Sequence, residues 1–264
     1  MNPPCAELLA PPRWQAVDVI ADLHLHPAEP ATAAAWRRYL LGSPASAVFM
    51  LGDLFEAWVG DDAARPGSFE GECAAVMQAA SARCALYFMR GNRDFLVGPA
   101  FLAACGVQDL PCDPTALTLG GQRWLLSHGD ALCLEDVAYQ QFRRQVRQPA
   151  WQQQFLARPL AERQALARQM RSASRQAQAD SENWADVDEA AARALLAACQ
   201  APVLIHGHTH RPATHALGDG LSRIVLSDWC LDDAAPRAQV LRLRPGQPPA
   251  RLGLDEALAP LIPL

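Results

Sequence analysis

Five short apolar runs in this sequence each end in residues that can bind a metal ion. The runs are typical of buried β-strands, and helix-like segments such as 29–41 and 69–82 lie between them. They cover residues 16–20, 47–51, 84–89, 123–127 and 202–206, and are followed by ADLHLH, GDLFE, RGNRD, HGD and GHTH. This alternation predicts an α/β fold. Because open α/β sheets bind ligands at the carboxyl ends of their strands, we expect the five segments to meet in one crevice.

Two later runs, 222–227 and 238–243, have no long helix between them and predict a second, more antiparallel sheet. The chain has 264 residues, half of them hydrophobic, so it can bury one large core with or without an insertion. Its formal net charge of −5 argues against a nucleic-acid-binding protein.

The cysteines and the absence of targeting signals indicate a cytoplasmic protein. The eight cysteines include no CxxC pair and several lie in apolar runs, so we expect reduced thiols. The first residues have neither the basic start nor the continuous apolar stretch of a signal peptide. No segment approaches the ~20 apolar residues that span a bilayer, so we expect a soluble protein that is at most peripheral to a membrane.

The residues after the five runs offer carboxylate, amide and imidazole ligands. Asp22 and His24 are two positions apart, so both are expected to reach one ion from an extended strand end. The complete candidate set is Asp22, His24, Asp53, Asn92, His128, His208 and His210. Mixed nitrogen and oxygen ligands suit Mn²⁺, Fe²⁺ or Zn²⁺. Seven ligands are too many for one tetrahedral ion, but two ions that share Asp53 account for all of them and predict hydrolysis of a phosphoester or phosphoanhydride.

The motifs DxH, GD, GNxD, HGD and GHTH, in this order over about residues 17–228, resemble the calcineurin-like metallophosphoesterase superfamily. The resemblance implies two β-sheets packed face to face and flanked by helices. It also implies one ion held by Asp22, His24, Asp53 and His210. The other ion would be held by Asp53, Asn92, His128 and His208. His26 and His206 match no ligand position, and we expect them to be supporting or structural residues.

One position departs from many members of this superfamily. They carry histidine in GNHD, where this chain has Arg93 in GNRD. Arginine cannot act as a general acid near neutral pH, but it can hold a phosphate oxygen bidentately. That suits a leaving group that is itself a phosphate, and it makes Asn92, Arg93 and His128 the candidate catalytic residues. The simpler alternative is an ion pair between Arg93 and Asp94.

Longer segments, at 52–62, 91–98, 128–149 and 155–174, resemble the family of UDP-2,3-diacylglucosamine diphosphatases. The resemblance implies water attack on the α-phosphorus of UDP-2,3-diacylglucosamine, giving UMP and 2,3-diacylglucosamine 1-phosphate for lipid A synthesis. It implies two divalent ions, expected to be Mn²⁺, and a place on the cytoplasmic face of a Gram-negative inner membrane. The alternatives are another dinuclear metallophosphoesterase with a different nucleotide diphosphate, and a non-catalytic scaffold of the same fold. A scaffold would have lost ligands, and all seven are present.

The domain organisation is predicted as a core over 15–135 and 182–246, an inserted helical cap over 136–181, and a C-terminal tail over 247–264. Residues 136–180 hold eight arginines and three acidic residues. Their apolar side chains are Trp151, Phe155, Leu156, Leu160, Leu166 and Met170. We expect the arginines to face the diphosphate or lipid headgroups and the apolar residues to hold acyl chains at an anionic membrane surface. Composition alone favours an ordinary packed helical pair with solvated arginines, and it is the resemblance that favours the lipid-binding cap.

The resemblance also implies which residues bind the substrate, a nucleotide-linked lipid. They are Asn92, Arg93, Asp136, Tyr139, Ser174, Gln178, Ser181 and His208. Gln178 and Ser181 stand where Asn and Lys are usual, which leaves the contacts to the phosphate or sugar open. No nucleic acid and no obligate protein partner is expected.

Overall fold

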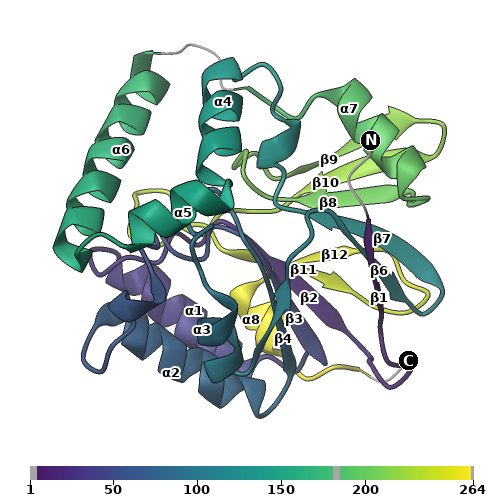
Figure 1. Ribbon diagram of the computed structural model, residues 1–264. Helices are drawn as coiled ribbons and strands as arrows, with labels where there is room; N and C mark the ends of the chain where they lie inside the picture. Colours follow the sequence, from purple (N-terminus) through teal and green to yellow (C-terminus); the bar gives the residue numbers. More distant parts are fainter. Residues whose placement is uncertain (1–4, 181–184, 263–264) are drawn as a thin grey trace.

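The computed structural model describes residues 5–180 and 185–262, with side chains for 5–171 and 185–262. Two six-stranded sheets pack face to face, with helices on both outer sides (Figure 1). This confirms the α/β class and the flanked double sheet that the sequence predicts.

The first sheet follows the order β12-β11-β2-β3-β4-β5. Its members from β2 to β5 run parallel, whereas β11 pairs antiparallel with both β2 and β12. The strands are β2 (Val17–Ile20), β3 (Ala47–Leu51), β4 (Ala85–Met89), β5 (Val107–Leu110), β11 (Gln239–Leu243) and β12 (Ala250–Gly253).

The second sheet follows the order β1-β6-β7-β8-β10-β9 and mixes parallel and antiparallel pairs. Its strands are β1 (Ala6–Leu9), β6 (Thr115–Leu119), β7 (Gln122–Ser127), β8 (Val203–His206), β9 (Ala213–Gly218) and β10 (Leu221–Val225). The prediction that runs 222–227 and 238–243 share a second sheet is wrong. They form β10 and β11, which lie in different sheets, because each pairs with a strand from an earlier part of the chain.

Alternating side chains of the central strands separate two parts of the core. Val17 and Val19 of β2 face the second sheet, whereas Ile20 packs among the helices on the outer side. These helices, α1 (Pro30–Gly42), α2 (Phe69–Ser81), α3 (Pro99–Ala104) and α8 (Leu254–Leu258), cover the first sheet. The second sheet is covered by α7 (Glu189–Ala198), which packs Ala192 and Leu196 against it. Strands buried on both faces explain the continuous apolar runs of the sequence.

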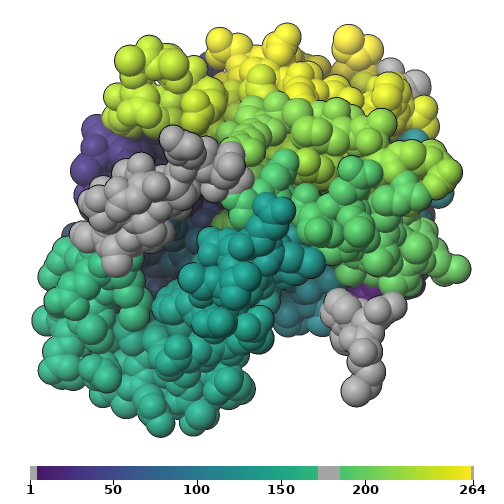
Figure 2. Space-filling view, turned by 90° about the horizontal axis from the view of Figure 1, so that it is seen from above, coloured from purple at the N-terminus to yellow at the C-terminus, as the bar shows by residue number. Residues whose placement is uncertain are grey.

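Three helices form an insertion between β7 and α7. They are α4 (Val137–Val146), α5 (Pro149–Leu156) and α6 (Leu160–Asp180). In Figure 1, α4 and α6 rise on either side of α5, and the view from above shows these teal and green segments along one side of that face (Figure 2). Among the described residues, no helix combines the length and apolar character needed to cross a membrane.

The predicted boundaries of core, cap and tail stay a prediction. Residues 250–258, within the predicted tail, form β12 and α8, and β12 continues the first sheet. Strand β1 precedes the predicted core and pairs with β6.

A buried ion pair joins two strands of the first sheet and is hydrogen-bonded to helix α1. Asp18 on β2 is fully buried and accepts from Arg242 Nε and Nη2, at 2.7 and 2.8 Å, and from the Tyr39 hydroxyl at 2.8 Å. Asp18→Ala should lower the free energy of unfolding by about 3–5 kcal/mol, because Arg242 would stay buried without its counterion. Urea denaturation measures this change. The matched control Arg38→Ala removes an exposed ion pair with Asp255 and should cost about 1 kcal/mol or less. Equal losses in the two variants would contradict the prediction.

Candidate metal centre

The candidate ligands follow the ends of strands from both sheets. β2, β3 and β4 of the first sheet lead into the DxH, GD and GNRD segments, and β7 and β8 of the second lead into HGD and GHTH. The structure brings all seven sequence-predicted metal ligands together, in two groups.

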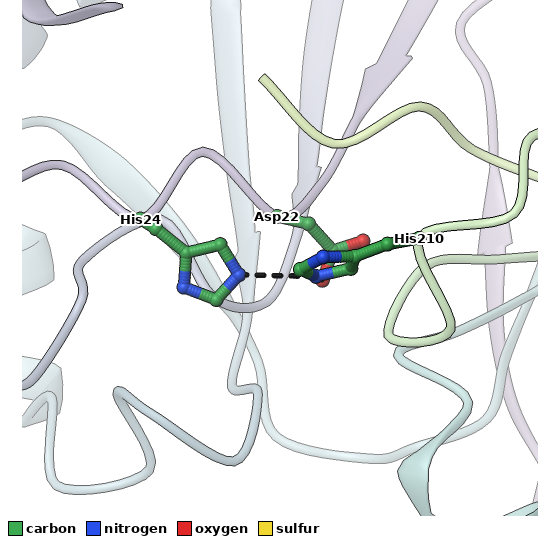
Figure 3. Close-up of side chains that lie close together, drawn as sticks. All are labelled: Asp22, His24 and His210. Atoms are coloured by element: carbon green, nitrogen blue, oxygen red, sulfur yellow. Dashed lines mark hydrogen bonds and ion pairs between the residues drawn. The ribbon is translucent and has the colours of Figure 1, made fainter. Parts of the chain in front are cut away.

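The first group consists of Asp22, His24 and His210, whose candidate ligand atoms all lie within 4.8 Å of one another. The two imidazole Nε2 atoms are 3.1 Å apart (Figure 3). His210 Nε2 lies 3.7 Å from Asp22 Oδ1. Two nitrogens and a carboxylate oxygen therefore converge on one point.

The second group consists of Asp53, His128 and His208, with ligand atoms within the same 4.8 Å limit. Asn92 joins it, because its Oδ1 is 2.9 Å from His128 Nε2 and 2.8 Å from His208 Nδ1. An amide oxygen that faces two imidazole nitrogens is the arrangement expected of a shared ligand sphere.

Asp53 lies between the two groups. Its Oδ2 is 3.9 Å from His24 Nε2 in the first group, and its Oδ1 is 3.6 Å from His128 Nε2 in the second. Oδ1 also accepts a hydrogen bond from the Arg93 backbone N–H at 2.8 Å, which fixes the carboxylate. One carboxylate that faces both groups is what two ions with a bridging ligand require.

The backbone at these ligands is not extended. Asp22, His24, Asp53, His208 and His210 all have φ between +48° and +67°. The expectation of an extended strand end is therefore wrong. Strand β2 ends at Ile20, and the backbone at Asp22 and at His24 is in the left-handed region. Such conformations are rare for residues other than glycine and concentrate at functional sites.

Glycines in the motifs allow close approach of the backbone to the carboxylates. A Cβ at Gly91 would lie 2.1 Å from Asp53 Oδ1, and one at Gly207 would lie 2.3 Å from Asp22 Oδ2. The His208 N–H donates to the same Asp22 oxygen at 2.8 Å. Because these contacts leave no room for a Cβ, glycine stands directly before Asn92 and directly before His208.

The electrostatics of the centre fit divalent cations. Asp22 Oδ1 is buried and has no hydrogen-bond partner among the described residues. Burial raises the pKa of Asp22, but His210 and the other histidines outweigh it and hold the pKa below its ordinary value. Burial lowers the pKa of His128, but Asp53, Asp130 and Asp22 outweigh it and raise that pKa to about 9. Carboxylates that attract a proton onto a buried imidazole also attract a metal ion in its place. The two groups of nitrogen and oxygen ligands fit divalent metal ions.

Two carboxylates not predicted from the sequence lie beside the Nδ1 atoms of His24 and His210. Glu56 Oε2 lies 2.9 Å from His24 Nδ1, and Asp228 Oδ2 lies 3.6 Å from His210 Nδ1. Carboxylates of this kind commonly orient metal-binding histidines. Both follow strand ends, Glu56 in GDLFE and Asp228 after the run 222–227, so the same strand-end pattern could have found them.

Arg93 does not pair with Asp94. The buried Asp94 carboxylate accepts from the backbone N–H groups of Gly91 and Leu54, both at 2.8 Å. Arg93 Nε is buried without a hydrogen-bond partner among the described residues. The simpler alternative for Arg93 is therefore wrong, and its positive charge instead contributes, against the effect of burial and together with His24, to lowering the pKa of the Glu56 carboxyl.

Histidines outside the two groups have other contacts. His206 is fully buried, with Nδ1 2.8 Å from its neighbour's carbonyl oxygen, Gly207 O, and Nε2 3.4 Å from Arg223 Nη1. His26 Nδ1 accepts from the Ala28 N–H at 3.1 Å. Both contacts are local or structural, as the sequence analysis expects.

The predicted substrate-binding residues of the cap are only partly described. Tyr139 packs against His208, with ring centroids 5.8 Å apart, and its hydroxyl donates to Asp130 Oδ2 at 2.5 Å. Asp136 is exposed and caps α4 by accepting from the Tyr139 N–H at 2.9 Å. The side chains of Ser174 and Gln178, and all of Ser181, lie outside the described residues. Substrate binding by these residues stays a prediction.

Four cap arginines contact the core. Arg143 Nε donates to Asp130 Oδ2 at 2.7 Å, and Arg147 Nη2 donates to the Gly91 carbonyl at 2.8 Å. On α6, Arg163 pairs with Asp62 and Arg171 pairs with Glu56. Each of these four thus binds a carboxylate or carbonyl of the core, and the expectation that cap arginines face diphosphate or lipid stays a prediction.

Apolar cap residues are also divided between two roles. Phe155 is buried and stacks on Trp151 with ring centroids 5.0 Å apart, and Leu160 and Leu166 pack on the same core cluster. Leu156 and Met170 are each 40% exposed. Trp151 and Phe155 therefore attach the cap to the core, which leaves Leu156 and Met170 as the candidates from this set for contact with a lipid.

The profile of the calcineurin-like phosphoesterase family matches residues 16–212. The chain belongs to this family. The match contains all five motifs and both ligand groups.

Proteins named UDP-2,3-diacylglucosamine hydrolase are similar to the chain over most of its length. The one from Chromobacterium violaceum is 50% identical over 223 residues, which cover 81% of this chain and 90% of that protein. The one from Bordetella pertussis is 47% identical, covering 85% and 88%. The one from Stenotrophomonas maltophilia is 43% identical, covering 80% and 89%.

Asp53→Asn tests the shared ligand with little change to the backbone. Asparagine tolerates a positive φ and can still accept from the Arg93 N–H, but it lacks the charge that two cations would share. We expect bound metal to fall from two ions per chain to at most one, and turnover to fall by about a thousandfold, since a loss of several kcal/mol of charge stabilisation corresponds to that factor. Elemental analysis of the folded variant measures the metal.

The matched control for this experiment is Asp219→Asn. Asp219 also has a positive φ, but its carboxylate pairs with Arg193 away from both groups. The control should keep two ions and full turnover. Two ions bound by folded Asp53→Asn, with unchanged turnover, would contradict the role of Asp53.

Proposed function

We propose that this protein hydrolyses the diphosphate of UDP-2,3-diacylglucosamine, giving UMP and 2,3-diacylglucosamine 1-phosphate. The observation that carries the proposal is Asp53, one buried carboxylate that faces two groups of metal-type ligands. Membership of the phosphoesterase family and the names of relatives at 43–50% identity support hydrolysis of this substrate in lipid A synthesis.

The chemistry follows from the residues in and around the two groups. Divalent ions held there would supply a nucleophilic water at neutral pH and neutralise charge on the diphosphate oxygens. Asn92 and His208 border the second group, and Arg93 supplies a guanidinium that stays charged and can hold a phosphate oxygen. The leaving sugar phosphate needs no proton, so arginine suffices where a general acid would otherwise be needed.

Several finer assignments belong to the same proposal. We take Mn²⁺ as the metal, since mixed nitrogen and oxygen ligands suit it. Asp136, Tyr139, Ser174, Gln178 and Ser181 of the cap would bind the glucosamine diphosphate. The exposed Arg144, Arg158 and Arg168 would attract the cap to an anionic membrane surface, at about 1 kcal/mol each.

The alternatives differ from this proposal in measurable ways. A non-catalytic scaffold would have lost ligands, but the structure brings all seven together. Another dinuclear phosphoesterase would act equally well on nucleotide diphosphates without acyl chains. Incubation of the purified protein with Mn²⁺ and UDP-2,3-diacylglucosamine, followed by detection of UMP, tests the proposal directly.

Attack on the α-phosphorus predicts where the oxygen of water appears. Hydrolysis in ¹⁸O-labelled water should place the label in UMP, because the sugar phosphate leaves with its bridging oxygen. Mass spectrometry of both products measures this. Label in the lipid phosphate would mean attack on the other phosphorus and would reverse the placement of the uridine side.

Acyl chains should contribute strongly to catalysis. Each buried methylene is worth about 0.8 kcal/mol, so the loss of even four methylene contacts would lower kcat/KM by more than about a hundredfold. We therefore expect UDP-glucosamine to be a poor substrate beside the diacyl form. Leu156→Glu and Met170→Glu should raise KM for the diacyl substrate alone and leave metal content unchanged. Equal cleavage of the two substrates would contradict the lipid-binding role and favour a dinuclear phosphoesterase that acts on another nucleotide diphosphate.

A further inference from the structure

Glu56 is held beside His24 by the backbone as well as by its side chain. The His24 and Leu25 N–H groups donate to the Asp53 and Leu54 carbonyls, at 2.9 and 2.8 Å. The Glu56 N–H in turn donates to the Leu25 carbonyl at 3.2 Å. The two metal-binding segments therefore run as a short paired ladder, and Glu56 is fixed at its end.

The side chain of Glu56 determines which nitrogen of His24 faces the metal group. Glu56 Oε2 lies 2.9 Å from His24 Nδ1, while His24 Nε2 lies 3.1 Å from His210 Nε2 and 3.9 Å from Asp53 Oδ2. The contact is an ion pair rather than a well-aligned hydrogen bond, since His24 Nδ1 has no hydrogen-bond partner among the described residues. The negative charge of Glu56 still favours the proton on the nearby Nδ1, which leaves the Nε2 lone pair toward the first group.

The other oxygen of Glu56 binds the cap. Glu56 Oε1 pairs with Arg171 Nη2 of α6, and both side chains are largely buried, with 11% and 18% of the side chain exposed. An uninterrupted chain of contacts thus runs from a helix of the insertion, through one carboxylate, to a candidate metal ligand.

We infer that Glu56 is a positioning residue that couples cap helix α6 to the metal ligand His24. The inference rests on the proposed ligand role of His24 but not on the identity of the substrate. Metal at the first group fixes His24, which fixes Glu56 and through it Arg171. Coupling free energies are reciprocal, so the position of α6 must in turn affect metal affinity at the same group.

The chain offers a matched control on the same helix. Arg163 of α6 pairs with Asp62 of the core, and neither residue is a candidate ligand or contacts one among the described residues. Glu56→Gln and Asp62→Asn each remove one carboxylate charge from an arginine of α6. Only the first also removes a carboxylate from a histidine of the metal group.

Titration of metal-free protein with Mn²⁺ separates positioning from general support of the fold. Loss of a carboxylate behind a metal-binding histidine typically lowers affinity 10- to 100-fold. We expect Glu56→Gln to weaken one of two Mn²⁺ by about that factor and the other by less than about twofold. Asp62→Asn should weaken neither. Equal weakening of both ions, no weakening, or the same weakening in Asp62→Asn would overturn the inference, and wild-type protein that binds no Mn²⁺ would instead overturn the proposed centre.

Hydrogen exchange tests the reverse direction without substrate or activity. Mn²⁺ should slow amide exchange in α6 around Arg171 of the wild-type protein, because exchange reports local opening. The slowing should persist in Asp62→Asn and disappear in Arg171→Met, which leaves Glu56 and His24 intact and keeps the test usable if Glu56→Gln does not fold. Metal-dependent protection of α6 that survives in Arg171→Met would show that the Glu56–Arg171 pair does not carry the coupling.

Discussion

The structure depends on how it compensates six carboxylates buried at the edge where strands of both sheets end, Asp22, Asp53, Glu56, Asp94, Asp130 and Asp228. Burying a charge is costly unless a partner is buried with it. Asp94 is satisfied by backbone N–H groups. Glu56 and Asp130 are paired with arginines of the cap, and Asp228 is paired with Arg237. The remaining two face histidines and, on our proposal, metal ions. The cap is thus part of the electrostatic balance of the core and not a separate attachment to it.

The same edge carries backbone strain. Five of the seven candidate ligands have positive φ, a conformation that costs on the order of 1–3 kcal/mol per strained residue, least for Asp, Asn and His. All five lie in loops, within four residues of the end of a strand of a close-packed sheet. Motif glycines let the neighbouring backbone reach the carboxylates of Asp22 and Asp53. The rigid double sheet holds a ligand geometry that the local sequence would not adopt alone.

Sequence patterns predicted the parts of this molecule that depend on local order. Buried strands such as β3 are continuous apolar runs, and ligand motifs directly follow them, so strands and candidate ligands could be located together. Short or half-exposed strands such as β1 lack that signal and were not predicted. The separation of β10 and β11 depends on long-range pairing, which periodicity does not contain. The sequence does not show that arginines of α4 and α6 are paired with the core, because their partners Asp130 and Glu56 lie in other segments of the chain.

The charge at this edge also bears on the order in which metal ions and substrate bind. A diphosphate would approach an edge that contains several buried carboxylates, and like charges within a few ångströms repel strongly in a poorly solvated site. Four of the seven cap arginines whose side chains are described are already paired with the core, and Arg93 alone cannot neutralise a diphosphate. Two divalent cations add a charge of +4 to the same edge. On our proposal, metal bound before the anionic substrate would remove this repulsion, and through Glu56 the charged centre would also act on helix α6, which the substrate meets.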